Sequence, residues 1–294
     1  MSGLSQRLRT SLHGLNPLQR IMLLNVGIFL VIRIINAISG LFLFPIFIEI
    51  DVTESLALPA SIDRLMHKPW TIITYMFLHW EFFHLLSNML FLYYFGRLLL
   101  EYLGPKKLVA TYLLGGIAGG FFYILAFNTI PLFAGDLPIS VAMGASASVM
   151  AITLAAATLL PDYEFSIVLL GPVRIKWIAL AVLVMDVINI SSSNTGGHIA
   201  HLGGALYGYL FVRFLRQGTD ISGWLQRLLT FGFQHRTMRT VHRSSKGSDS
   251  QYLTAKKDRE ERLDLILDKI SRSGYGSLSS EERDFLFKAS KDQE

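Results

Sequence analysis

The sequence has no cysteine and few charged residues. The absence of cysteine excludes disulfide bonds, thiol nucleophiles and thiolate metal sites. Charged residues make up 17% of the 294-residue chain, whereas an ordinary soluble domain carries about a quarter. Hydrophobic residues make up 51%, and long apolar stretches fill residues 21–216 while the charges gather at the two ends. This distribution predicts a membrane protein with polar terminal segments.

A secretory signal peptide is also not expected. Residues 1–20 are polar and amphipathic, and no small-residue cleavage site follows the first apolar stretch. The net charge of +5 could indicate binding to nucleic acid or to anionic lipid. Lys and Arg residues that flank apolar helices explain it more simply. We therefore expect the lipid bilayer as a partner and no nucleic acid.

Apolar segments recur at the length needed to cross a bilayer core, which is about 30 Å thick and takes roughly 20 helical residues. The six expected spans are 21–39, 82–100, 108–127, 143–160, 173–190 and 197–215. The sequence thus predicts a polar segment at 1–20, a helical membrane domain at 21–216 and a soluble basic linker with a helical tail at 217–294.

The loops between the spans differ in charge, which predicts their orientation. Lys and Arg lie before the first span, at the joins of spans two with three and four with five, and after the sixth, whereas loop 128–142 has only Asp136 and loop 191–196 has no charge. The positive-inside rule then places both termini in the cytoplasm, as in a multi-pass protein of a bacterial inner membrane. Loop 40–76 lies outside, and its apolar stretch 41–50 is expected to embed partly in the outer interface.

The C-terminal tail shows a helical pattern. Apolar residues recur at helical spacing on a charged background, at Leu263, Ile266, Leu267 and Ile270. Ser279 and Glu282 have the spacing of a capping box, which predicts a helix start. We expect two short helices there, either as an accessory docking element or as a passive tail.

Two polar residues at the outer ends of predicted spans could form a catalytic pair. Ser146 lies near the start of the fourth span among small residues, and His201 lies near the start of the sixth. At about 1.5 Å of rise per residue, both are expected at a similar shallow depth. A serine hydroxyl needs a neighbouring base to become a nucleophile, and histidine suits that role near neutral pH.

Further polar and small residues have several interpretations. His84 and Asn88 share one face of the second span and could donate to an oxyanion, or could simply join two helices. Small residues recur every four positions on the fourth and sixth spans and predict that these helices pack closely, at Ala147, Ala151, Ala155, Gly204 and Gly208. Two polar pairs, Arg33 with Asn36 and Asp186 with Asn189, are assigned to helix packing or to snorkelling.

A metal site is not expected. His79 and His84 are five residues apart, so they do not share the helix face that a His-Glu-x-x-His zinc motif requires. His198 and His201 could supply two ligands, but no carboxylate or cysteine lies near them in the sequence. The sequence therefore predicts neither a metal nor another cofactor.

Two motifs resemble those of a known enzyme family. Gly144 and Ser146 form a Gly-x-Ser pattern, and His201, Gly204 and Gly208 form a His-x-x-Gly-x-x-x-Gly pattern. The first is similar to the nucleophile motif, and the second to the sixth-helix motif, of the rhomboid intramembrane proteases.

The resemblance extends over residues 20–216. His84 and Asn88 form a His-x-x-x-Asn pattern that is similar to the second-helix motif of the family. Trp70 and His79 fall where a loop tryptophan and a further histidine are expected. The resemblance implies an all-α membrane protein, a six-transmembrane-helix rhomboid-like bundle with a partly membrane-embedded first external loop and a small helical cytoplasmic tail.

The resemblance also implies a mechanism and a substrate class. Ser146 would attack the substrate carbonyl from a cavity open to the outside, and His201 would accept and return the proton. His84, Asn88 and the backbone N–H of Ser146 would hold the oxyanion. The family uses this dyad without an aspartate, and cuts single-span membrane proteins in or near their transmembrane segments.

Three departures from the family pattern bear on activity. Ala147 stands where glycine usually follows the nucleophile, Met150 where an aromatic residue often stacks on the catalytic histidine, and Thr71 where arginine usually follows the loop tryptophan. An active protease is the first interpretation. A catalytically silent rhomboid-like protein that binds membrane clients is the second, and a channel or transporter is the third.

Overall fold

The computed structural model describes residues 14–41, 48–167, 171–191, 194–231 and 248–291. The chain divides into two compact units, Met1–Phe233 and Gln234–Glu294. Both are mostly helical in the part of the chain that is described.

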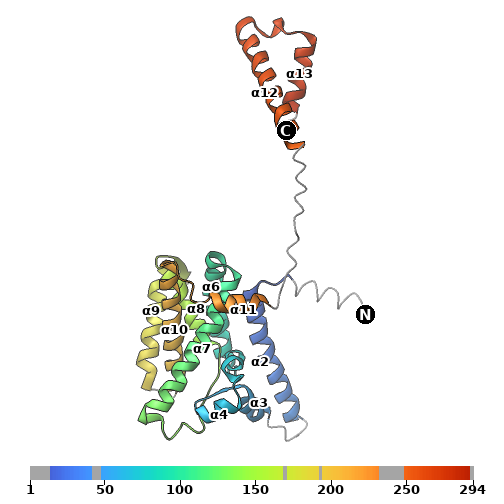
Figure 1. The fold of residues 1–294 in the computed structure, drawn as a ribbon. Helices are drawn as coiled ribbons and strands as arrows, with labels where there is room; N and C mark the ends of the chain where they lie inside the picture. The colour runs from blue at the N-terminus through green and yellow to red at the C-terminus, as the bar shows by residue number, and fades with distance from the viewer. Residues whose placement is uncertain (1–13, 42–47, 168–170, 192–193, 232–247, 292–294) are drawn as a thin grey trace. The chain divides into compact units, whose positions relative to one another are not determined.

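Six helices form the body of the first unit, in which neighbouring helices pack side by side (Figure 1). They are α2 (Pro17–Leu41), α6 (Phe82–Leu103), α7 (Pro105–Thr129), α8 (Ser146–Leu159), α9 (Ile175–Ile188) and α10 (Thr195–Arg216). Among the described residues, α2, α6 and α7 are long and apolar enough to cross a membrane. The chain is therefore a membrane protein, and each of the six expected spans coincides with a helix.

Two of these helices are shorter than the sequence predicts, with 14 residues each in α8 and α9. The expected span at 143–160 loses its first residues because strand β2 (Val141–Ala142) pairs with β1 (Leu58–Pro59), and Gly144 turns the chain with φ of 125°. The expected span at 173–190 begins late because strand β4 (Gly171–Arg174) pairs with β3 (Glu164–Ile167). Ser146 is consequently the first residue of its helix.

The helix that carries Ser146 lies at the centre of the unit. α8 contacts α6, α7, α9 and α10, and most of its residues are buried. An apolar helix that is covered on all sides is typical of the core of a bundle. The helix therefore holds the start of its first turn in a fixed position relative to four neighbours.

The loop before α6 folds into short elements: α3 (Ile48–Leu56), α4 (Ile62–His67), α5 (Thr71–Thr74) and the 3₁₀ turn η1 (Tyr75–Phe77). The side chain of Arg64 forms an ion pair with Glu54 at 2.8 Å and donates to the carbonyl of Pro138 at 2.8 Å. The indole N–H of Trp70 donates to the carbonyl of Ser55 at 2.7 Å. Thr71, where arginine was expected, donates from its hydroxyl to the carbonyl of Lys68 at 2.7 Å. Most of the predicted interfacial stretch 41–50 lies outside the described residues.

The remaining elements of the first unit are the 3₁₀ turns η2 (Pro131–Phe133) and η3 (Asn189–Ser191) and the helix α11 (Gly223–Phe231). α11 follows the sixth helix of the body and packs on α7, where Leu225 contacts Ala110 and Leu114. α11 is therefore part of the first unit.

The second unit is a pair of helices, α12 (Ser248–Ser273) and α13 (Ser280–Lys291), joined by the 3₁₀ turn η4 (Tyr275–Ser277). The predicted capping box is confirmed: the backbone N–H of Ser279 donates to Glu282 at 2.7 Å, and the backbone N–H of Glu282 donates to the Ser279 hydroxyl at 3.2 Å. Ile266, on the predicted apolar stripe, is buried. Lys269 joins the helices by donating to the Glu282 carboxylate at 2.9 Å.

The contact between α8 and α10 depends on glycine. A Cβ atom added at Gly204 would lie 2.1 Å from the carbonyl oxygen of Ala147, and one added at Gly208 would lie 2.0 Å from that of Ala151. The predicted close packing of these two faces is confirmed. Because the obstructing atoms belong to the backbone, no side chain of either helix can move aside to make room.

We predict that Gly208→Ala destabilises the first unit by about 1–3 kcal/mol, as overpacking of a tight core does. The matched control is Gly27→Ala in α2, because a Cβ atom there meets nothing within 4 Å. Thermal unfolding in detergent should show a lower melting temperature for Gly208→Ala and an unchanged or higher one for Gly27→Ala. Equal melting temperatures for both variants would contradict the packing described.

Candidate active site

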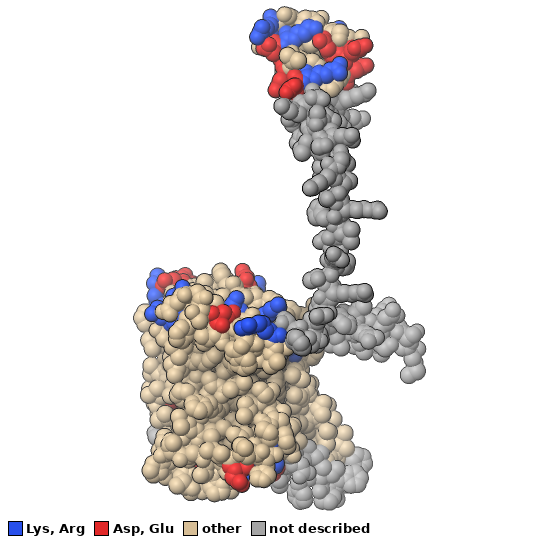
Figure 2. Space-filling view, viewed as in Figure 1, with Lys and Arg blue, Asp and Glu red and all other residues tan. Residues whose placement is uncertain are grey.

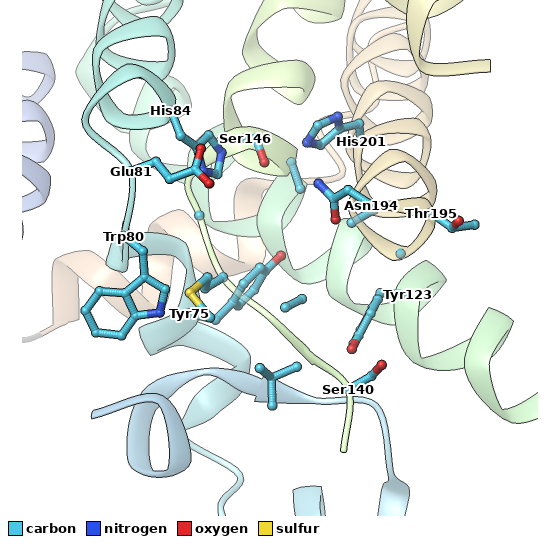
Figure 3. Close-up of a pocket in the computed structure, with 18 of the residues that line it drawn as sticks. Tyr75, Trp80, Glu81, His84, Tyr123, Ser140, Ser146, Asn194, Thr195 and His201 are labelled. Atoms are coloured by element: carbon cyan, nitrogen blue, oxygen red, sulfur yellow. The ribbon is translucent and has the colours of Figure 1, made fainter. Parts of the chain in front are cut away.

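A cavity of about 800 Å³ opens at one end of the helical body. Its walls come from the start of α6, the segment around β2, the end of α7 and the starts of α8 and α10. Ser146, His201 and His84 all line it, and Figure 3 shows the Ser146 hydroxyl between the two imidazole rings. The structure thus brings together three of the four site residues predicted from the sequence.

The turn before Ser146 lets the Ser146 and His84 side chains approach each other. A Cβ atom at Gly144 would lie 2.9 Å from Cε1 of His84 and 3.6 Å from the Ser146 hydroxyl oxygen. The φ of 125° at Gly144 is also one that residues with a side chain rarely adopt. The backbone N–H of Gly144 donates to the carbonyl of Tyr75 at 2.9 Å, which ties the turn to the preceding loop. Glycine is therefore required here for both conformation and space.

His201 has a partner that the sequence analysis did not assign to the site. Its Nδ1 lies 2.8 Å from Oδ1 of Asp186, and Nδ1 of His198 lies 2.8 Å from the same oxygen. Asp186 is buried near the end of α9, where packing or snorkelling had been expected. The three side chains are also placed so that they could hold a metal ion, with their ligand atoms within 4.8 Å of one another.

The second oxyanion candidate does not line the cavity. Asn88 is one helical turn after His84, buried, and outside the described lining of the cavity. Its Nδ2 lies 3.1 Å from Nε2 of His79. Asn88 therefore supports a neighbouring histidine in this structure, as in the helix-joining interpretation, and its role towards an oxyanion stays a prediction.

His79 holds the segment before Ser146. Its Nε2 accepts the backbone N–H of Ala145 at 3.3 Å, so this nitrogen must be unprotonated. Burial, and next the neighbouring His84, lower the pKa of His79 to about 3, which agrees with a neutral ring. A proton on Nε2 would remove the acceptor, and the segment leading to Ser146 would lose this contact.

The lowered pKa of His79 makes the stability of the fold depend on pH. The unfolded chain takes up a proton on the imidazole of His79 below about pH 6.5, whereas the native chain does so only near pH 3. Stability is therefore fully present above pH 6.5 and falls as the pH is lowered, by about 1.4 kcal/mol per unit at most. The melting temperature should be several degrees lower at pH 5 than at pH 7.

The test compares His79→Gln, which keeps an acceptor but does not titrate, with His67→Gln in the same loop, where the histidine is exposed. The melting temperature of His79→Gln should depend less on pH than that of the wild type, and His67→Gln should behave as the wild type. The assignment fails if His79→Gln keeps the full pH dependence.

Known protein families match both the membrane part and the C-terminal part of the chain. The Rhomboid domain family matches residues 66–218, which include the site, and a family of unknown function, DUF6576, matches residues 247–292. The chain is 31% identical over 157 residues to RHOMBOID-like protein 12, mitochondrial, of Arabidopsis thaliana, which covers 50% of this chain and 47% of that protein. It is 30% identical over 160 residues to Presenilin-associated rhomboid-like protein A, mitochondrial, of Danio rerio, covering 53% and 39%.

A further relative, Inactive RHOMBOID-like protein 8 of Arabidopsis thaliana, is 32% identical over 85 residues, covering 29% of this chain and 24% of that protein. The chain thus spans less than half the length of the relatives named. The two longer matches are named mitochondrial, so the comparisons give no support to the bacterial inner membrane that we expected. The match to the Rhomboid domain over residues 66–218 shows that this chain belongs to the rhomboid family.

Proposed function

We propose that this chain is an intramembrane serine endopeptidase that hydrolyses peptide bonds in or near the transmembrane segments of single-span membrane proteins. The observation that carries the proposal is the placement of Ser146 and His201 on facing walls of one cavity within an apolar helical body (Figure 3). His84 on the opposite side of the hydroxyl adds a hydrogen-bond donor. Membership of the rhomboid family supports the same activity.

In the proposed reaction, the Ser146 oxygen attacks the substrate carbonyl while Nε2 of His201 accepts the hydroxyl proton. His201 then gives this proton to the leaving amine, and a water molecule releases the acyl group by the same route in reverse. Since Nδ1 of His201 is held by Asp186, Nε2 is the ring nitrogen left for this exchange.

The oxyanion would be held by His84 and by the start of α8. Backbone N–H groups in the first turn of a helix have no partner within that helix, so that of Ser146 can donate to an anion. The N–H of Ala145 is used by His79 instead. Asn88 is proposed as a further donor through the amide whose Nδ2 contacts His79.

The substitution of alanine for the glycine that usually follows the nucleophile is accommodated. Ala147 is buried, and its Cβ would lie 2.4 Å from a Cβ atom added at Gly119 of α7. Glycine on the neighbouring helix therefore leaves the space that the extra methyl group occupies. This supports an active rather than a silent nucleophile helix.

The proposed topology has six transmembrane helices, with both termini in the cytoplasm. Figure 2 shows Lys and Arg gathered at one end of the first unit and a broad belt without charged residues on the face shown. Three basic residues lie at helix ends: Lys107 at the start of α7, Arg174 directly before α9 and Arg216 at the end of α10. The cavity, in contrast, is lined by the end of α7 and the starts of α8 and α10. With these charges inside, the cavity opens outward.

The second candidate function is a silent rhomboid-like protein that binds membrane clients. This candidate is supported by the match of part of this chain to a relative whose name calls it inactive. The two functions differ in whether a single-span reporter is cut.

We predict that purified wild-type protein in liposomes cuts a single-span reporter with an unstable transmembrane segment, and that Ser146→Ala and His201→Ala abolish cleavage because they remove the nucleophile and its base. Ser148→Ala is the matched control, since Ser148 is a buried serine on the same helix. Cleavage by Ser146→Ala would refute the nucleophile. No cleavage by the wild type across a panel of reporters would favour the client-binding function.

We further predict that His84→Ala lowers kcat by about 10²–10³-fold, as removal of one oxyanion donor does. The control is Ser87→Ala, which lies on the same turn of α6 and lines the same cavity but donates to the carbonyl of His84. Steady-state cleavage of the reporter measures both. A loss of less than 10-fold for His84→Ala would remove His84 from the oxyanion site.

A further inference from the structure

We propose that Asp186 is a positioning residue for His201, so that this chain works with an aspartate-histidine-serine triad instead of a serine-histidine pair alone. The inference rests on the proposed protease function and goes beyond it in naming the group that sets the state of the base. It stands on the geometry of α9 and the start of α10.

The carboxylate of Asp186 lies where a charge is costly. The side chain is 7% exposed and belongs to the last turn of α9, an apolar helix. Burial penalises a carboxylate, and the negative end of the helix dipole at this terminus adds to the penalty. A carboxylate at such a position needs strong donors, and the structure supplies two imidazole nitrogens at 2.8 Å.

The contact decides which nitrogen of His201 carries the proton. A carboxylate only accepts, so Nδ1 of His201 must be the protonated nitrogen. Nε2 then keeps its lone pair, as a base for Ser146 requires. Without the carboxylate, the neutral ring could carry its proton on Nε2, and that tautomer cannot accept the proton of Ser146.

The same contact acts during the reaction. When the Ser146 proton moves to Nε2, His201 becomes a cation, and Asp186 lies against its other nitrogen to stabilise the charge. The proton stays on His201 until it passes to the leaving amine, and Asp186 remains ionised. His198 shares Oδ1 of Asp186, and its ring meets that of His201 edge-on at 5.8 Å between centroids. It therefore helps to hold the carboxylate in place.

A metal ion bound to the same three side chains is the competing interpretation. Ligands on a tetrahedral zinc ion with bonds of about 2.0–2.1 Å lie roughly 3.3 Å apart. Each nitrogen here lies 2.8 Å from the shared oxygen, the distance of a charge-assisted hydrogen bond with the proton between the two atoms. The distances favour a proton over a metal.

The test compares Asp186→Asn with Asp186→Glu and with the control Asn189→Ala, which changes a polar residue at the same end of α9. Reporter cleavage in liposomes gives kcat and KM, and a fluorophosphonate gives the rate at which Ser146 is modified. We expect Asp186→Asn to lower kcat and the modification rate by about 10²–10⁴-fold with KM within about threefold. Asp186→Glu should recover part of the loss, and Asn189→Ala should match the wild type.

A second measurement needs no variant of Asp186. Nitrogen-15 spectra of the full chain labelled at histidine, assigned with His201→Gln, should show His201 protonated at Nδ1, and a proton on Nε2 would overturn the proposal. So would full activity of Asp186→Asn in an active wild-type background, or activity that chelation abolishes and added zinc restores. A wild type that cuts nothing would refute the protease function instead, because the spectrum is read independently of cleavage.

Discussion

The structure depends on the backbone-to-backbone contact of α8 and α10. Two apolar helices in a membrane gain little from the hydrophobic effect, so their association relies on close packing. Gly204 and Gly208 allow this by leaving room for the carbonyls of Ala147 and Ala151. Ser146 directly precedes the first of these contacts in α8, and His201 precedes it by three residues in α10. The glycines thus bring the two side chains to the same cavity.

Around this contact, polar groups are buried in pairs and triplets. His79 accepts a hydrogen bond from the N–H of Ala145 and contacts Asn88, which fixes the segment that leads into Ser146. A single carboxylate oxygen of Asp186 accepts hydrogen bonds from His198 and His201. In apolar surroundings an unpaired polar group is costly. These partners therefore hold both sides of the site in defined positions without any ligand.

The sequence predicted correctly those structural features that depend on local residue spacing. The helix positions, the small faces of α8 and α10 and the capping box at Ser279 follow from spacing along one segment, and the structure agrees with them. The late start of α8 could not be predicted, because it depends on strand pairing with a loop more than 80 residues earlier. Asp186 was assigned to helix packing and does join α9 to α10, but its partners could not be predicted because they lie 12 and 15 residues away on another helix. Its depth, close to that of His201 in the adjoining helix, was the signal that could have found it.

The proposed activity depends above all on Ser146 being a nucleophile that its position in this cavity activates. The most direct measurement is peptide mass spectrometry of the wild-type chain after reaction with a fluorophosphonate in liposomes. We expect a single adduct on Ser146 and none on Ser148, two residues further along the same helix. An unmodified Ser146, or an adduct formed only on another serine, would contradict it.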